Sequence, residues 1–315
     1  MNFARQGAEA RSNSCAGGPT KRTPALRAAL TIDLHDTDRP EDIFACVAWL
    51  EARGLRATFF VPTRMLEEAR FTRAFDAIDG GPHEIGTHAH RHDLTEVRAL
   101  GAPRPTPSQL DFLDRGVALY EARFRRSPHA FRSPAWCYVS DAAASRLSRL
   151  GYTVDSSATP QRAGILSSQP FRSPWLFTPR SPHPRTPTLF EVPTSCLLFP
   201  LSRTALYLLR TWGILAFMEL FVRETQLFPE RPVVLQLHPN DLSPSAPDEP
   251  IHFAWTDVLP LPQRGFHARY WLMDTDRERA VARAARVLEE LTSRGFVWHT
   301  LSEIRGLCLE GSRAT

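Results

Sequence analysis

The sequence lacks the features that mark secreted, membrane-spanning and disulfide-stabilised proteins. Its 315 residues include five cysteines, an odd number at wide spacings with no CxxC pair, which indicates reduced thiols and not a disulfide framework. No run of about 18 apolar residues occurs, so no transmembrane helix is predicted. Residues 1–23 contain no apolar core of the kind that a secretory signal needs. We therefore expect a cytoplasmic protein whose residues 1–25 form a disordered tail.

Lysine is nearly absent as well. Lys21 is the only lysine among 38 basic residues, and the arginines are scattered without forming a run. A nucleic-acid partner is therefore not expected, because nucleic-acid-binding proteins gather their basic residues on one face or along one helix. The formal net charge of +4 and the sequence pI of about 9.0 still allow contact with anionic lipid or phosphate.

The sequence does contain a regular alternation of strand-like and helix-like segments. Hydrophobic residues make up 43% and charged residues 23%, which suits a globular domain with a sizeable core. Alternating strands and helices predict an α/β fold with a parallel sheet or barrel. Strands are predicted within residues 27–33, 56–62, 81–90, 129–136, 152–157 and 231–241, and helices within 40–54, 107–124, 140–151 and 275–295, followed by a closing strand and turn at 296–304.

Reactive side chains follow these predicted strands at their carboxyl ends. In parallel barrels the carboxyl ends lie together at one face, where active sites are built. The pattern therefore predicts one functional site assembled from residues that are far apart in the sequence. The residues concerned are Asp33, the histidines of 88–92, Arg132, Asp155 and His238.

The segment GTHAHRH, Gly86–His92, holds three histidines in five residues. An imidazole pair such as His88 and His92, with one further ligand, suits a divalent metal such as zinc, which takes three protein ligands and a water in catalytic sites. His90 is not needed to complete this pair, and a turn would point it away from the metal. We assign His90 a supporting role only.

The segment TIDLHD, Thr31–Asp36, places a second reactive group at the end of the first strand. Metal-assisted hydrolysis needs a carboxylate that takes a proton from the attacking water beside a metal ion. Asp33 is the candidate for that carboxylate. His35 and Asp36 follow within three residues, and either is a candidate for the third metal ligand.

Five motifs in order resemble the NodB-homology polysaccharide deacetylases of carbohydrate esterase family four. They are TIDLHD, HAHRH, FRSPAW, YTVDSS and LQLHP, and the resemblance covers about residues 27–305. It implies a distorted (β/α)7 barrel over residues 26–310, with a proline-rich insertion at about 160–200. It also implies a metal-dependent enzyme that removes an N-acyl group, acetyl or formyl, from an amino sugar or glycan precursor, with zinc as the expected metal.

The resemblance assigns roles to individual positions. Asp33 matches the catalytic base, His88 and His92 match the metal-binding histidines, and His238 matches the general acid that protonates the leaving amine. These four positions carry the chemistry that the family performs.

The resemblance also assigns the groups around them. Arg132 matches the arginine that orients the base, and Asp155 matches the acid that helps to hold that arginine. The backbone N–H of Ala135 matches the oxyanion hole, and Trp136 would lie beside the substrate.

The sequence departs from the family pattern at three positions. Leu34 stands where an aspartate usually follows the base, Ala89 replaces a serine or threonine within the histidine motif, and Ala135 replaces an aromatic residue. The metal ligands are thus either three histidines, with His35, or two histidines with Asp36. Metal identity and substrate preference are the properties that these departures leave open.

Two other functions fit part of the pattern. The HxH pair of His88 and His90 also marks amidohydrolase-type metal barrels, but there it usually follows the first strand, and the Arg132 loop has no role in that scheme. A non-catalytic glycan-binding protein on the same fold would fit if the changes to Leu34 and Ala135 had abolished metal binding. The metal content of the purified protein separates these alternatives.

An apolar stretch at 197–222 bears on the source of the substrate. It forms either a helix of the core or an interfacial helix that lies on a membrane near a lipid-linked sugar, where Arg203 and Arg210 would meet phosphate. Without an export segment, the expected substrate is a free, nucleotide-linked or lipid-linked N-acyl sugar. The sugar, its carrier, the acyl group and the oligomeric state are left open.

Overall fold

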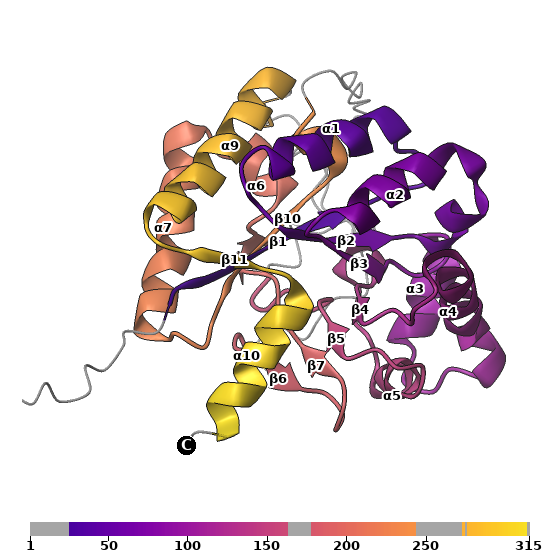
Figure 1. The fold of residues 1–315 in the computed structure, drawn as a ribbon. Coiled ribbons are helices and arrows are strands. Elements are labelled where there is room, and N and C mark those ends of the chain that lie inside the picture. Colours follow the sequence, from indigo (N-terminus) through magenta and orange to yellow (C-terminus); the bar gives the residue numbers. More distant parts are fainter. Residues whose placement is uncertain (1–24, 163–177, 244–272, 275, 314–315) are drawn as a thin grey trace, which may run out of the picture.

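The fold is a curved, mainly parallel sheet with helices packed outside it (Figure 1). The computed structural model describes residues 25–162, 178–243, 273–274 and 276–313. The main sheet has the order β10-β1-β2-β3-β4-β5-β7-β6, with β11 also pairing with β1, and β8 and β9 form a separate pair. The strands are β1 (Arg27–Asp33), β2 (Ala57–Val61), β3 (Glu84–Thr87), β4 (Ala130–Phe131), β5 (Val154–Asp155), β6 (His183–Pro184), β7 (Phe190–Glu191), β8 (Cys196–Leu197), β9 (Phe199–Pro200), β10 (Val233–Leu237) and β11 (Val297–His299).

The helices surround this sheet and bury its outer face. The largest core cluster joins apolar side chains of β1, β2 and β10 to those of α1, α2, α7 and α9. The α-helices are α1 (Pro40–Glu51), α2 (Thr72–Gly80), α3 (Leu94–Gly101), α4 (Asp111–Phe124), α5 (Asp141–Arg149), α6 (Arg203–Leu208), α7 (Thr211–Leu227), α9 (Arg277–Ser293) and α10 (Leu301–Arg313). Short 3₁₀ helices that matter below are η1 (Thr63–Glu67), η4 (Pro134–Trp136) and η6 (Pro239–Asp241).

The sheet curls into a distorted barrel, as the sequence predicts. Each neighbouring pair from β10 through β1 to β7 is parallel, and only β6 runs antiparallel to its neighbour. The segment after β7 returns to the other edge of the sheet, where the Ser195 N–H donates to the carbonyl of Val234 at 3.0 Å and the Gln236 N–H donates to Leu201 at 3.1 Å. The carboxyl ends of the strands therefore meet at one face.

The predicted strands and most of the predicted helices form. The strand at 27–33 has the predicted bounds, and the helix at 140–151 begins as expected with the Ser140 side chain accepting from the N–H of Ala143. The prediction of a turn after the last strand is wrong, since α10 follows it. Thr300 and Glu303 form a reciprocal capping box there, with each side chain accepting from the other's N–H.

The proline-rich segment at 160–200 is not wholly irregular. Its strand β7 pairs with β5 through Val154–Phe190 and Asp155–Glu191 and so extends the main sheet. Residues 163–177 of this segment, and the predicted tail except for its last residue, lie outside the described residues. The domain bounds of 26–310 stay a prediction.

The apolar stretch at 197–222 contains β8, β9, α6 and most of α7. Helix α7 buries Ile214, Phe217 and Phe221 against the core, but its Trp212 is 85% exposed and its Leu220 is 47% exposed. Both faces of this helix are thus partly apolar. Within the described residues, no helix has the length and apolar character needed to cross a bilayer.

Candidate active site

A buried arginine forms the centre of the site. Arg132 follows β4, its side chain is fully buried, and its guanidinium lies over the ring of Phe60 at 4.5 Å from the centroid. Its nitrogens donate to Asp33 Oδ1 (2.8 Å), Thr31 Oγ1 (2.7 Å), the carbonyl (2.8 Å) and hydroxyl (2.8 Å) oxygens of Ser156, and Thr194 Oγ1 (3.4 Å). Arg132 thus holds Asp33, the residue predicted to be the base, by a buried ion pair.

Close strand packing brings the arginine and the histidine segment together. A Cβ at Gly86 would lie 2.6 Å from the carbonyl oxygen of Ala130, so only glycine lets β3 approach β4 this closely. The next residue in register, Thr87, pairs with Phe131, and the Arg132 N–H donates to the Thr87 carbonyl at 3.0 Å. His88 and Arg132 are therefore neighbours at the ends of adjacent strands.

The histidine segment is a turn with two left-handed residues. Ala89 and His92 have φ values of 59° and 55°, which non-glycine residues seldom adopt. The Glu96 carboxylate accepts from the backbone N–H groups of His90 at 3.0 Å and Arg91 at 2.8 Å and so holds the turn in place. Its burial raises the pKa of Glu96.

His90 contacts the neighbouring helix η1. Its Nδ1 lies 3.0 Å from the hydroxyl of Thr63 in η1, and its side chain is buried. It therefore packs the histidine turn against η1.

Four imidazoles lie together beside the ion pair, and we call them the imidazole cluster: His35, His88, His92 and His238. The ring centroid of His35 is 4.5 Å from that of His92, 4.8 Å from that of His238 and 6.4 Å from that of His88, while His88 and His92 are 5.0 Å apart. The cluster draws on the ends of β1, β3 and β10, so the structure brings together the residues that the sequence singled out.

Burial keeps three members of the cluster neutral. Desolvation lowers the pKa of His35, His88 and His92, and the neighbouring imidazoles lower it further for His35 and His88. The carboxylate of Asp33 raises the pKa of His92 but does not offset burial. Neutral imidazoles have the lone pairs that a metal ion requires.

The donor chemistry of the cluster fits a divalent metal. His88 Nδ1 lies 2.9 Å from the carbonyl of Arg132, a partner of the kind that orients metal-ligating histidines and leaves Nε2 as the ligand atom. Asp36 instead lies 3.8 Å from Arg64, so His35 is the better placed third donor. A turn closed by the Asp38 carboxylate, which accepts from the His35 N–H at 2.8 Å, holds His35 in the cluster.

The ligand arrangement predicted from the sequence is nevertheless not formed. Across the described ranges, no three His, Cys, Asp or Glu side chains converge closely enough to hold a metal ion. Leu34, which replaces the family's aspartate, contributes nothing to such a group because its side chain is fully buried in the core. His88, His92 and His35 are the residues that would hold the metal.

His238 has its own network at the end of β10. Its backbone N–H donates to Asp241 Oδ2 at 2.9 Å, and its Nδ1 lies 3.6 Å from the same carboxylate. Asp241 is fully buried, and Arg203 lies 3.5 Å from it and lowers its pKa against the effect of burial. The expected contact of Arg203 with phosphate is replaced by this ion pair with Asp241.

Asp155 lies in a different place from the one that the resemblance implies. The donors of Arg132 go to Ser156, and Asp155 Oδ1 instead accepts from the backbone N–H of Ser157 at 3.2 Å and from the Ser157 hydroxyl. The strand alternation explains the difference, because neighbouring residues of β5 and its extension point to opposite faces. Asp155 is therefore not the group that holds Arg132.

The predicted oxyanion residues form a strained turn. Ala135 and Trp136 have φ values of 52° and 51°, and the Cys137 N–H donates to the Pro134 carbonyl at 3.1 Å. The guanidinium of Arg162 lies 5.1 Å from the ring centroid of Trp136, and its Nη1 lies 3.3 Å from the Ala135 carbonyl oxygen.

Sequence reasoning missed four residues that shape this site: Asp38, Ser156, Glu191 and Asp241. Asp38 lies beside His35, and burial raises its pKa to about 6. In the sequence, the only signal for Asp38 is its short spacing from His35, and the only signal for Asp241 is its short spacing from His238. Glu191 carried no signal, since it becomes a neighbour of Asp155 only through the pairing of β5 with β7.

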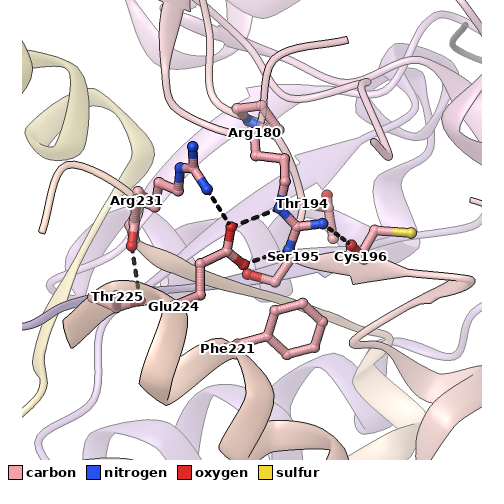
Figure 2. A pocket seen from close by; sticks show the side chains of 10 residues that line it. Arg180, Thr194, Ser195, Cys196, Phe221, Glu224, Thr225 and Arg231 are labelled. Carbon is pink, nitrogen blue, oxygen red and sulfur yellow. Dashed lines mark hydrogen bonds and ion pairs between the residues drawn. The ribbon is translucent and has the colours of Figure 1, made fainter. Parts of the chain in front are cut away.

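A polar pocket near the site is too small for a sugar. In Figure 2, Arg180 and Arg231 both point at Glu224 of α7, with Nε–Oε1 and Nη1–Oε1 distances of 2.6 and 2.9 Å. The pocket has a volume of about 20 Å³, room for about one water molecule. Arg180 also donates to the Cys196 carbonyl at 2.8 Å, so its side chain links β8 to α7.

Comparisons with known proteins agree with this architecture. Residues 20–154 match the family model described as polysaccharide deacetylase. A structure from Mycobacterium smegmatis assigned to the polysaccharide deacetylases is 16% identical, with a TM-score of 0.50 over 90% of this chain and 96% of that one. The search of curated proteins gave no match.

Two further structures are more distant. A CE4 esterase of Streptococcus mutans is 11% identical over 88% of this chain and 86% of that one, with a TM-score of 0.49. A CE4 family pseudoenzyme from Bacillus anthracis is 11% identical over 90% of this chain and 66% of that one, with a TM-score of 0.47.

Proposed function

We propose that this protein, whose residues 20–154 match the polysaccharide deacetylase family model, hydrolyses the N-acyl group of an amino sugar with the help of a divalent metal. The observation that carries the proposal is the buried ion pair of Arg132 with Asp33 beside the imidazole cluster. Metal-assisted hydrolysis needs a positioned carboxylate as the base and neutral imidazoles as metal ligands, and this arrangement supplies both.

The side chains divide the reaction between them. Asp33 takes a proton from the attacking water, whose oxygen bonds to the acyl carbon, and Arg132 keeps that carboxylate in position. The C–N bond then breaks, and His238 gives a proton to the departing amine, so that a carboxylate and a free amino sugar are formed. A bound metal would polarise the acyl oxygen and lower the pKa of the attacking water.

His88, His92 and His35 are the proposed ligands, and zinc is the proposed metal. Zinc accepts three imidazoles together with a water in catalytic sites, and it suits borderline nitrogen donors. The neutral state of the three rings supports this assignment, because protonated imidazoles cannot bind a cation.

A sugar precursor, lipid-linked in preference to polymeric, is the proposed substrate. The exposed Trp212 and Leu220 of α7 support a peripheral contact with a membrane. A cavity of about 560 Å³ at the start of α7 is lined by Arg210, Arg279 and Arg283 together with Asp274, which pairs with Arg279 and Arg283. Arg210 is the arginine of this cavity that we propose for a phosphate group. The cytoplasmic location stays a prediction of the sequence.

An amine-release assay tests the proposed activity. The purified protein is incubated with a panel of N-acetyl and N-formyl sugars in free, nucleotide-linked and polyprenyl-linked form, and the metal content is measured in parallel. We expect amine release from at least one member, loss of that activity after treatment with a chelator, and recovery on addition of zinc. A metal-free protein that binds glycans and releases no amine would contradict the proposal and support a non-catalytic role.

A further inference from the structure

The turn that carries the proposed oxyanion donor needs support from its surroundings. Two successive non-glycine residues, Ala135 and Trp136, adopt left-handed φ values. Each such residue costs roughly 1–2 kcal/mol, so the conformation persists only where neighbouring contacts enforce it. The contacts of Ser133, the residue before the turn, show where that enforcement comes from.

Ser133 is fixed by both of its polar groups. Its hydroxyl donates to the carbonyl of Cys137 and so closes the turn from one side to the other. Its backbone N–H donates to the hydroxyl oxygen of Ser157 at 2.8 Å. Ser133 and Ser157 are both buried, so no solvent competes for these hydrogen bonds.

Asp155 determines which way the Ser157 hydroxyl faces. A serine hydroxyl has one proton to donate and two lone pairs to accept with. The proton of Ser157 goes to Asp155 Oδ1, so a lone pair is left for the N–H of Ser133. The carboxylate also accepts from the Ser157 N–H at 3.2 Å, which fixes the backbone as well.

Glu191 holds Asp155 from the neighbouring strand. The two residues are register partners between β5 and β7, and their carboxyl groups lie in a fully buried setting. Burial raises the pKa of both groups, and the carboxylate of Asp155 raises the pKa of Glu191 further. Glu191 Oε1 also accepts from the Ala158 N–H at 2.9 Å, and Arg185 lies 3.7 Å from its Oε2.

We propose that Asp155 acts through Ser157 and Ser133 to position the turn at Pro134–Trp136, so that the Ala135 N–H points to the developing oxyanion. Asp155 and Ser157 are positioning residues in this scheme, and the inference rests on the proposed deacylation. It replaces the contact with Arg132 that the family resemblance implies.

Removal of one hydroxyl tests the chain of contacts. Ser157→Ala deletes the acceptor of the Ser133 N–H, and we expect kcat to fall by about 10–100-fold with KM within about twofold, because an oxyanion donor acts mainly in the transition state. Ser157→Thr keeps the hydroxyl and should restore most of kcat. Thr159→Val is the matched control, since Thr159 is a buried neighbour whose hydroxyl has no hydrogen-bond partner among the described residues.

Asp155→Asn separates positioning from charge. The amide oxygen still accepts from Ser157, and its NH₂ group can donate to Glu191, so kcat should stay within about threefold of the wild type if geometry is what matters. A loss as large as that of Ser157→Ala would show that the charge of Asp155 is needed and would overturn its assigned role.

Crystal structures make the inference independent of the substrate. In Ser157→Ala the turn at Pro134–Trp136 should leave the left-handed conformation, and in Ser157→Thr and Thr159→Val it should keep it. An unchanged turn in Ser157→Ala overturns the inference even if no substrate has been found. Absence of amine release by the wild type, with a displaced turn in Ser157→Ala, would instead contradict the proposed function alone.

Discussion

At the scale of single residues, Arg132 explains why the site is rigid. All three of its nitrogens donate to protein oxygens, and the side chain is fully buried. Removing one partner of a buried ion pair leaves an uncompensated charge and typically costs about 3–5 kcal/mol. The other hydrogen bonds of Arg132, to Thr31 and Ser156, keep its position when Asp33 is altered. We therefore expect Asp33→Asn, whose amide oxygen can still accept from Arg132, to be less stable than the wild type but folded.

Asp33→Asn and His238→Ala should therefore abolish most turnover while the protein stays folded. Loss of a positioned acid or base typically lowers the rate by about 10²–10⁴-fold. The measurement is kcat/KM for amine release, with circular dichroism and a thermal melt as controls for folding. Val297→Ala, a change at an exposed residue of β11, serves as the matched control. Near-normal activity in either of the first two variants would remove that residue from its assigned role.

That Asp33, His88, His92 and His238 lie together could be predicted because each ends or follows a strand and has a reactive side chain. In a parallel barrel the carboxyl ends of the strands share one face, so these residues could be placed together without knowing the distances between them. The partners of Asp155 could not be predicted, because Glu191 reaches it only across the β5–β7 pairing. That pairing lies in a proline-rich segment with no periodic pattern.

At the scale of elements, the histidine turn depends on the helix that follows it. Asp93 caps α3 by accepting from the N–H groups of Thr95 and Glu96, which directs the Glu96 side chain back to the turn. Glu96 then satisfies two backbone N–H groups of the turn, those of His90 and Arg91. The rings of His88 and His92 are thus oriented by a carboxylate that touches neither of them.

Glu96→Ala should weaken both the turn and the metal affinity. It leaves two backbone N–H groups without their acceptor, at a cost of about 1–3 kcal/mol for each group that stays buried. We expect a lower midpoint in urea unfolding and a weaker zinc affinity by titration calorimetry. Glu96→Gln keeps an acceptor oxygen and is the matched control. Equal zinc affinity in all three proteins would show that the turn holds its histidines without Glu96.

At the scale of the whole molecule, the barrel and its reactive face follow from the alternation of strands and helices, whereas the outer surface does not. Trp212 and Leu220 fall on one face of α7, with Leu227 a further seven residues on, while Ile214 and Phe221 face the core. Sequence periodicity could not separate the two faces, because both are apolar. The sequence therefore left both a core helix and an interfacial helix open.

We propose that the exposed face of α7 contacts a membrane. Trp212 is 85% exposed and Leu227 is 74% exposed. The exposed arginines Arg210 and Arg223 lie at the start and on the outer side of the same helix, where Arg223 pairs with Glu219 at 2.9 Å. An apolar stripe with arginines suits the boundary between acyl chains and anionic headgroups. A lipid-linked substrate would be met at that boundary.

Vesicle flotation tests this surface. We expect the protein to float with vesicles that contain phosphatidylglycerol and to float less with neutral phosphatidylcholine, because apolar burial and arginine–headgroup attraction act together. Trp212→Glu combined with Leu220→Glu should reduce the bound fraction by about tenfold, since each change removes apolar contact area and adds a repelled charge. Val297→Glu, the same change at an exposed residue of β11, should leave it unaltered. A wild-type protein that stays at the bottom of the gradient with both lipids would rule out membrane contact through α7 and favour a soluble sugar precursor.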